Sequence, residues 1–283
     1  MSMSTSNNQQ LLIIGALTGV SITLAATLFS RTNNNQRNQH DQPKPHHQNG
    51  SSTPNRTTDS TLARGYSIDE AQAHNVKRVQ LSAQRTPDEV LRDLQCGNTR
   101  FWMGVPQSSV ESPFKRHALQ NQQHPRVAIL GCADSRVPIS IVFDQGLGDI
   151  FAIRVAGNYL DTSTEGSLEY AVVHLQVKVL IIMGHEGCGA VGAAQLPQSE
   201  INKEPTCLCN LLSSIKEGLN EQHLKNICDK KAMDREAVVS NVNKQVVKLK
   251  SNVVVKRSIE RGELKVVGAF YQQSSGIVDF LEK

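Results

Sequence analysis

Two continuous apolar runs, at 127–130 and 179–183, stand out in the second half of the chain. Neither run alternates with polar residues, a pattern typical of strands that are buried on both faces of a parallel sheet. We therefore predict strands over about 126–131 and 178–183. A third, mostly apolar segment predicts another strand over about 149–154.

The segments between and after these strands favour helices. Apolar residues recur at helical spacing over 167–176, and 208–261 is helical in pattern throughout. A fourth strand is expected over 264–271, and 276–280 is either a short edge strand or a helix. This alternation predicts an α/β fold with a central, mostly parallel sheet of four to five strands flanked by helices.

Two helix starts precede the first strand. In Thr86-Pro-Asp-Glu89, threonine takes the N-cap position, proline the first turn and glutamate the capping-box position. Ser67-Ile-Asp-Glu70 has the same serine and glutamate spacing and predicts an earlier helix.

The N-terminal part differs in composition from the rest. Residues 11–29 contain no charged side chain and are nearly long enough to span a bilayer, so 1–30 is expected to be a membrane anchor or a signal segment. Residues 1–10 lack Lys and Arg, which favours an uncleaved anchor. The polar stretch 31–80 is interpreted as a disordered linker, and 81–283 as the folded domain.

Basic residues follow the apolar segment, at Arg31, Arg37 and Lys44. The positive-inside rule then keeps the folded domain on the cytoplasmic side of the membrane. The alternative is a periplasmic or otherwise extracytoplasmic domain released after signal cleavage.

Charge and cysteine content narrow the function. A net charge of +4, without a basic stripe interleaved with aromatic residues, argues against a nucleic-acid partner. The six cysteines have no even spacing, so no disulfide framework is inferred. Cys207 and Cys209 are interpreted as an incidental exposed pair, with metal binding or oxidation as the alternative.

The chemistry is concentrated behind the two apolar runs. Cys132-Ala-Asp134-Ser-Arg136 follows the first run, and His185-Glu-Gly-Cys188 follows the second. Two cysteines, one histidine and one aspartate form a complete tetrahedral ligand set for Zn²⁺. Arg136, two residues after Asp134, can instead hold that carboxylate in a bidentate pair, which would leave Cys132, His185 and Cys188 as three ligands beside an open position.

These two motifs resemble those of the β-class carbonic anhydrases, in the plant-like branch of that family. The likeness extends over roughly 85–283 and includes Cys96-Gly-Asn-Thr-Arg-Phe101 and the segment 148–158. The resemblance implies a zinc catalytic domain that interconverts carbon dioxide and bicarbonate, a homodimer or higher homo-oligomer, and N-terminal helices that pack on the dimer partner.

The resemblance also implies roles for single residues. Cys132, His185 and Cys188 would bind Zn²⁺, joined by Asp134 in a closed form of the site. In the open form, Asp134 and Arg136 would be catalytic. Four further residues match substrate-pocket positions of the family, and the glutamine is of the kind that reaches a neighbouring subunit's substrate: Gln123, Phe151, Tyr170 and Gly189.

The resulting hypothesis is reversible hydration of carbon dioxide to bicarbonate and a proton by a zinc-bound hydroxide. One alternative is hydrolysis of carbon disulfide or carbonyl sulfide on the same scaffold. The other is a membrane-tethered interaction subunit, held by residues 11–29, that keeps zinc for structure without catalysis.

Overall fold

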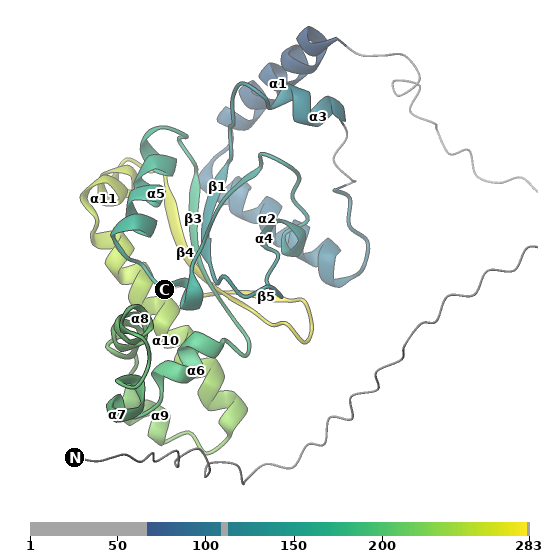
Figure 1. The fold of residues 1–283 in the computed structure, drawn as a ribbon. Helices are drawn as coiled ribbons and strands as arrows, with labels where there is room; N and C mark the ends of the chain where they lie inside the picture. The colour runs from purple at the N-terminus through teal and green to yellow at the C-terminus, as the bar shows by residue number, and fades with distance from the viewer. Residues whose placement is uncertain (1–66, 109–112, 282–283) are drawn as a thin grey trace, which may run out of the picture. The chain divides into compact units, whose positions relative to one another are not determined.

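The computed structural model describes residues 67–108 and 113–281 (Figure 1). The predicted anchor at 11–29 and residues 31–66 of the predicted linker lie outside these ranges and stay predictions. Within the described ranges, no helix combines the length and the apolar character that crossing a bilayer requires.

A five-stranded sheet forms the centre of this domain, in the order β2-β1-β3-β4-β5. The first four strands are parallel and β5 runs antiparallel to β4. This confirms the predicted α/β class and the mostly parallel sheet. The strands are β1 (Val127–Gly131), β2 (Ile150–Arg154), β3 (Val179–His185), β4 (Lys265–Tyr271) and β5 (Val278–Leu281).

Helices surround the sheet in sequence order. They are α1 (Ile68–Ala83), α2 (Pro87–Trp102), α3 (Pro113–Ala118), α4 (Ile139–Val142), the short 3₁₀ helix η1 (Ala156–Asn158), α5 (Thr162–Val173), α6 (Gly189–Ala194), α7 (Gln198–Ile201), α8 (Thr206–Lys216), α9 (Glu221–Lys225), α10 (Lys230–Ser251) and α11 (Val253–Glu260).

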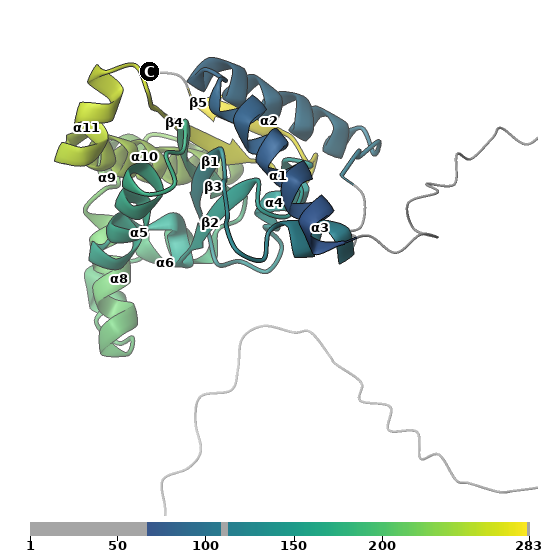
Figure 2. The same ribbon diagram turned by 90° about the horizontal axis from the view of Figure 1, so that it is seen from above.

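Two hydrophobic cores, one on each face of the sheet, follow from the alternation of side chains along a strand. In β1, Ala128 and Leu130 pack on the face covered by α5, α10 and α11, whereas Val127 and Ile129 pack on the face covered by α2 and α4. The two views show these helices on opposite sides of the strands (Figures 1 and 2). Burial on both faces explains why the apolar runs of β1 and β3 are continuous.

The strand order contains a switch point between β1 and β3. From β1 the chain passes through α4 to β2 on one side, and from β2 it passes through α5 back across β1 to β3 on the other side. In open α/β sheets, ligands bind beyond the carboxyl ends of the strands at such a point. The fold therefore indicates where a site should lie.

Glycine at two positions allows close packing around the sheet. A Cβ at Gly184 of β3 would lie 2.5 Å from Cγ1 of Val238, so α10 can rest directly on the strand. A Cβ at Gly97 of α2 would lie 2.0 Å from the carbonyl oxygen of Phe143, at the end of α4. Both glycines are required by contacts between elements that lie far apart in the sequence.

The Gly-Asn-Thr-Arg segment of α2 anchors three other parts of the chain. The Asn98 side chain donates to the carbonyl oxygens of Val142 (3.0 Å) and Gly276 (2.9 Å) and accepts from the N–H of Val278 (2.9 Å). Arg100 pairs with the buried carboxylate of Asp144. Burial alone would raise the pKa of Asp144, but hydrogen bonds from the 107–108 segment and Arg100 lower it well below its usual value.

Several predicted boundaries differ from the structure. The helix expected from 167 begins at Thr162, because Asp161 and Thr164 form a reciprocal capping box that precedes the apolar positions. Strand β3 continues two residues beyond the predicted 183 because β4 pairs with it as far as His185. The expected helical segment 208–261 is divided, and Asn252 caps α11 immediately after α10 ends.

Both predicted helix starts are present, with reciprocal side-chain and backbone hydrogen bonds at Thr86–Glu89 and Ser67–Glu70. Helix α1 consequently occupies residues 68–80 of the range that was interpreted as linker. The segment 276–280, left open between strand and helix, contains the start of β5.

We expect Gly97→Ala to lower the free energy of unfolding by about 3 kcal/mol, because its methyl group would overlap the Phe143 carbonyl. Gly166→Ala is the matched control: a Cβ there meets nothing within 4 Å inside α5. It should stabilise the protein by about 0.5–1 kcal/mol. Urea denaturation of both variants measures the difference, and equal stabilities would contradict this account of the α2–α4 contact.

Candidate metal centre

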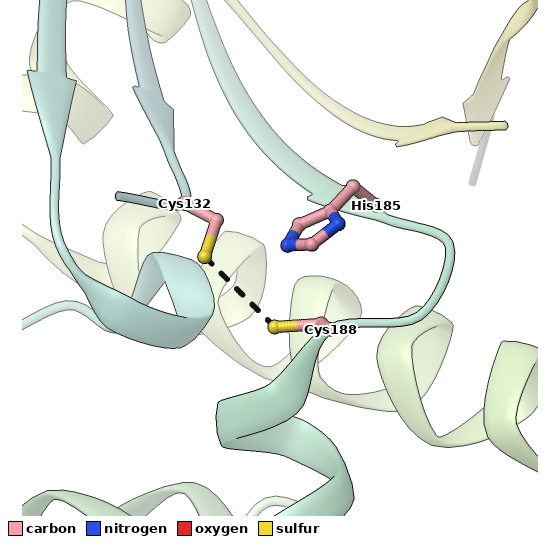
Figure 3. Close-up of side chains that lie close together, drawn as sticks. All are labelled: Cys132, His185 and Cys188. Carbon is pink, nitrogen blue, oxygen red and sulfur yellow. Dashed lines mark hydrogen bonds between the residues drawn. The ribbon is translucent and has the colours of Figure 1, made fainter. Parts of the chain in front are cut away.

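Two adjacent parallel strands bring the predicted ligands together. Gly131, the last residue of β1, lies opposite Met183 of β3. Cys132 therefore leaves the sheet beside the end of β3, where His185 is the last residue. A turn through Gly187, whose φ is +66°, then returns the chain so that Cys188 caps α6. Figure 3 shows the two thiols and the imidazole facing one another.

The three side chains form a compact donor cluster. The two Sγ atoms and a ring nitrogen of His185 lie within 4.8 Å of one another, and the two sulfurs are 3.9 Å apart. All three residues are buried. The buried Nε2 of His185 has no hydrogen-bond partner among the described residues, although such an atom normally has one. A metal ion would satisfy that nitrogen, and a thiolate and imidazole set fits Zn²⁺.

The ionisation of the two thiols supports a cation at this position. The hydrogen bond with Cys188 lowers the pKa of Cys132 to about 4, with further contributions from His185 and the backbone N–H groups of Asp134 and Gly157. The same contact with Cys132, followed by burial, raises the pKa of Cys188. Two thiolates this close repel each other, so both ionise only when a positive charge lies between them.

Asp134 is paired with Arg136. The backbone N–H and Nε of Arg136 donate to Oδ1 of Asp134 (2.9 and 3.0 Å), and Nη2 donates to Oδ2 (2.7 Å). These bonds, led by the side-chain contact, lower the pKa of Asp134 far below its usual value. Oδ2 of Asp134 nevertheless lies only 3.9 Å from Nε2 of His185. The carboxylate therefore stands at the edge of the cluster without completing it.

A second arginine, which the sequence analysis did not single out, fixes the loop after β1. Arg154, the last residue of β2, donates through Nε to the carbonyl oxygen of Cys132 (3.0 Å) and through Nη2 to that of Asp134 (2.6 Å). The signal available in the sequence was a basic residue at a strand's carboxyl end, level with Gly131. Arg154 and Arg136 together hold the Cys132–Arg136 segment from two directions.

The four predicted pocket residues do not all reach the cluster. Gly189 directly follows Cys188, and a Cβ there would meet nothing within 4 Å, so its backbone faces open space. Phe151 lies opposite Ala128, four positions before Cys132, or about 13 Å away at ~3.3 Å per residue. Tyr170 packs against Phe151 with ring centroids 6.1 Å apart. Gln123 precedes β1, so it is also at the amino end of the strands.

We expect His185→Ala to reduce bound zinc from one ion per chain to less than about a tenth, because two thiols alone cannot complete the ligand set. His223→Ala is the matched control, since His223 lies on α9 and contacts Glu236. Elemental analysis after dialysis gives both values. Zinc retained by His185→Ala would exclude this histidine as a ligand.

Comparisons with known proteins agree with this geometry. A family model described as "Carbonic anhydrase" matches residues 127–278, which contain all three cluster residues. The chain is 47% identical over 108 residues to carbonic anhydrase 2 of Mycobacterium tuberculosis, a match that covers 38% of this chain and 52% of the relative. It therefore spans about half of that relative's length. A carbonic anhydrase of Mycolicibacterium smegmatis is 30% identical over 202 residues, or 68% of this chain and 92% of the relative.

Solved structures share the fold. A tetrameric β-carbonic anhydrase of Sordaria macrospora superposes with a TM-score of 0.55 at 27% identity, covering 58% of this chain and 84% of that one. A β-carbonic anhydrase of Aspergillus fumigatus gives a TM-score of 0.52 at 32% identity, covering 58% of this chain and 78% of the other. The resemblance expected from the two motifs is confirmed, and the chain belongs to the β-class carbonic anhydrase family.

Proposed function

We propose that this protein catalyses the reversible hydration of carbon dioxide to bicarbonate and a proton, with Zn²⁺ held by Cys132, His185 and Cys188. The observation that carries the proposal is the Asp134–Arg136 pair beside a three-residue donor cluster. A purely structural zinc site needs a fourth protein ligand and has no use for a carboxylate held back by an arginine. Membership of the family supports the same activity.

Zinc bound here would supply Lewis acidity, which lowers the pKa of a water molecule enough for it to act as a nucleophile near neutral pH. The protein must then orient that water and admit carbon dioxide. Asp134 is placed to accept a hydrogen bond from the water, because its Oδ2 is 3.9 Å from Nε2 of His185. The hydrogen bond would hold a lone pair of the water oxygen toward the carbon atom of the substrate.

Asp134 is suited to orient a proton and poorly suited to remove one. Since Arg136 lowers the pKa of the carboxyl far below neutrality, Asp134 stays ionised throughout the working pH range and is a weak base. The proton released in the reaction must therefore pass to solvent or to another group. The N–H of Gly189 faces open space beside Cys188 and is positioned to bind a substrate oxygen.

A second copy of the chain would complete the substrate pocket. Gln123, Phe151 and Tyr170 lie at the amino ends of the strands, away from the cluster of their own chain, and Tyr170 is 46% exposed. Strand β2 forms an edge of the sheet, with β1 as its one partner within the described ranges. We propose that two copies associate along this edge, so that each supplies these side chains to the other's zinc site. The Sordaria relative is itself tetrameric.

The first test is stopped-flow hydration of carbon dioxide by the full zinc-loaded chain from neutral to alkaline pH. Arg136→Leu should keep its zinc but lose about a hundredfold in kcat/KM, because Asp134 is then free to turn onto the metal. The wild-type rate should rise with pH, as the nucleophilic water ionises. Titration of Asp134 cannot cause that rise, since a depressed pKa leaves the carboxylate fully charged over the whole range.

Matched measurements on Arg261→Leu provide the control, because that arginine pairs with Glu263 on the surface. Zinc-loaded wild type without activity at any pH would overturn the proposed function. A fully active Arg136→Leu variant would leave the function in place and remove the role given to the Asp134–Arg136 pair.

Subunit mixing tests the shared pocket. His185→Ala lacks a metal ligand and Gln123→Leu lacks a pocket residue, so each homodimer should be impaired. After the two variants are unfolded and refolded together in equal amounts, half of the dimers are mixed and each has one intact site. Activity should then recover to about a quarter of the wild-type value. No recovery above the sum of the separate variants would place Gln123 in its own subunit's site or outside the site.

A further inference from the structure

The two ring nitrogens of His185 have different surroundings. Nε2 faces the two cysteines and has no partner among the described residues. Nδ1 lies 2.9 Å from the carbonyl oxygen of Glu186 and 3.2 Å from the side-chain Nε2 of Gln273. Gln273 belongs to the turn between β4 and β5, nearly ninety residues away in the sequence. It carries no motif, and the sequence analysis did not single it out.

The two contacts at Nδ1 make opposite demands on its proton. The carbonyl oxygen of Glu186 can only accept, so it requires Nδ1 to carry a hydrogen. An amide nitrogen can only donate, so it requires a lone pair on the same atom. The carbonyl is fixed in the backbone, whereas the Gln273 amide exchanges its oxygen and nitrogen by a half-turn about its last side-chain bond. The conflict is resolved when Oε1 of Gln273 faces a protonated Nδ1.

That arrangement is also the one a metal ion requires. A neutral imidazole that binds a metal through Nε2 carries its hydrogen on Nδ1, and an acceptor at Nδ1 fixes the ring in this tautomer. Among the residues described, Glu186 and Gln273 provide the acceptors. The second acceptor would also make Nε2 a stronger donor to the metal.

The turn that carries Gln273 is held firmly in place. The N–H of Gln272 donates to the carbonyl oxygen of Ile277 (2.8 Å), and the N–H of Gly276 donates to that of Gln272 (2.8 Å). The N–H of Ser274 donates to the carboxylate of Glu186 (2.9 Å), the neighbour of the ligand histidine. This bond is the main reason why the pKa of Glu186 falls to about 2. Gln273 is therefore presented to His185 by a rigid segment, as positioning requires.

We propose that Gln273 is a positioning residue for the metal centre. Its side-chain oxygen accepts the Nδ1 hydrogen of His185 and thereby keeps Nε2 available to Zn²⁺. The proposal deepens the function proposed above and rests on it. It assigns a role in metal affinity to a turn that contributes no ligand.

Zinc affinity of the full chain, measured by competition with a chromophoric chelator, tests the proposal. Gln273→Leu should weaken zinc binding by about tenfold, the lower end of the effect of losing such a partner, because the Glu186 carbonyl remains. Gln273→Glu should bind zinc as tightly as wild type or more tightly, since a carboxylate can only accept. Gln272→Leu is the matched control: its side chain contacts Asp279 and Ser275 in the same turn, so its zinc affinity should be unchanged.

The glutamate variant separates hydrogen bonding from packing. Weakened binding in Gln273→Glu equal to that in Gln273→Leu would overturn the proposal, as would unchanged binding in Gln273→Leu. Circular dichroism identifies a variant that has lost its fold, and Gln273→Glu still decides the question if Gln273→Leu is one. Failure of the proposed function gives a different result, namely wild-type chain that binds zinc but does not hydrate carbon dioxide.

Discussion

The parallel pairing of β1 with β3 is the constraint on which the metal centre depends. It places Gly131 level with Met183, so that the chain leaves β1 beside the last residues of β3 and Cys132 meets His185. Hydrophobic burial on both faces fixes this register, because a shift by one residue would exchange the side chains that face the two cores. The ligands themselves contribute little to the pairing. The apolar residues of β1 and β3 determine where the metal ligands lie.

Around this pairing the protein holds each polar group from outside the cluster. Arg154 of β2 fixes the carbonyl groups of the loop that carries Cys132 and Asp134, and Arg136 fixes the carboxylate. On the other side, the β4–β5 turn contacts both His185 and Glu186. The order of strands is what makes these contacts possible, because β2 and β4 flank the β1–β3 pair. Each flanking strand thus contributes positioning groups to the ligands that come from the central two.

Much of the fold and of the donor set could be predicted from the sequence because the signals were local. Continuous apolar runs indicated β1 and β3, and ligand residues directly after them indicated the site. Helix α5 was predicted too short at its start because Asp161 and Thr164 cap it through hydrogen bonds that apolar spacing does not reveal. Gln273 could not be found, since its contact with His185 depends on the turn conformation and on a partner far away in the sequence. The pocket residues Phe151 and Tyr170 were recognised by resemblance, but only the register of β2 shows that they lie away from their own cluster.

The long-range bonds of Asn98 have a consequence for how the protein is made. This side chain joins α2, near the start of the domain, to Gly276 and Val278, near its end, across 178 and 180 residues. A nascent chain on the ribosome has all three metal ligands outside once Cys188 has emerged, but β4, the turn with Gln273 and β5 are still to be synthesised. Domains generally complete their packing as units. Capture of the metal during biosynthesis is therefore delayed until almost the whole chain has been translated, and a ribosome that stalls late releases a product with every ligand and no finished site.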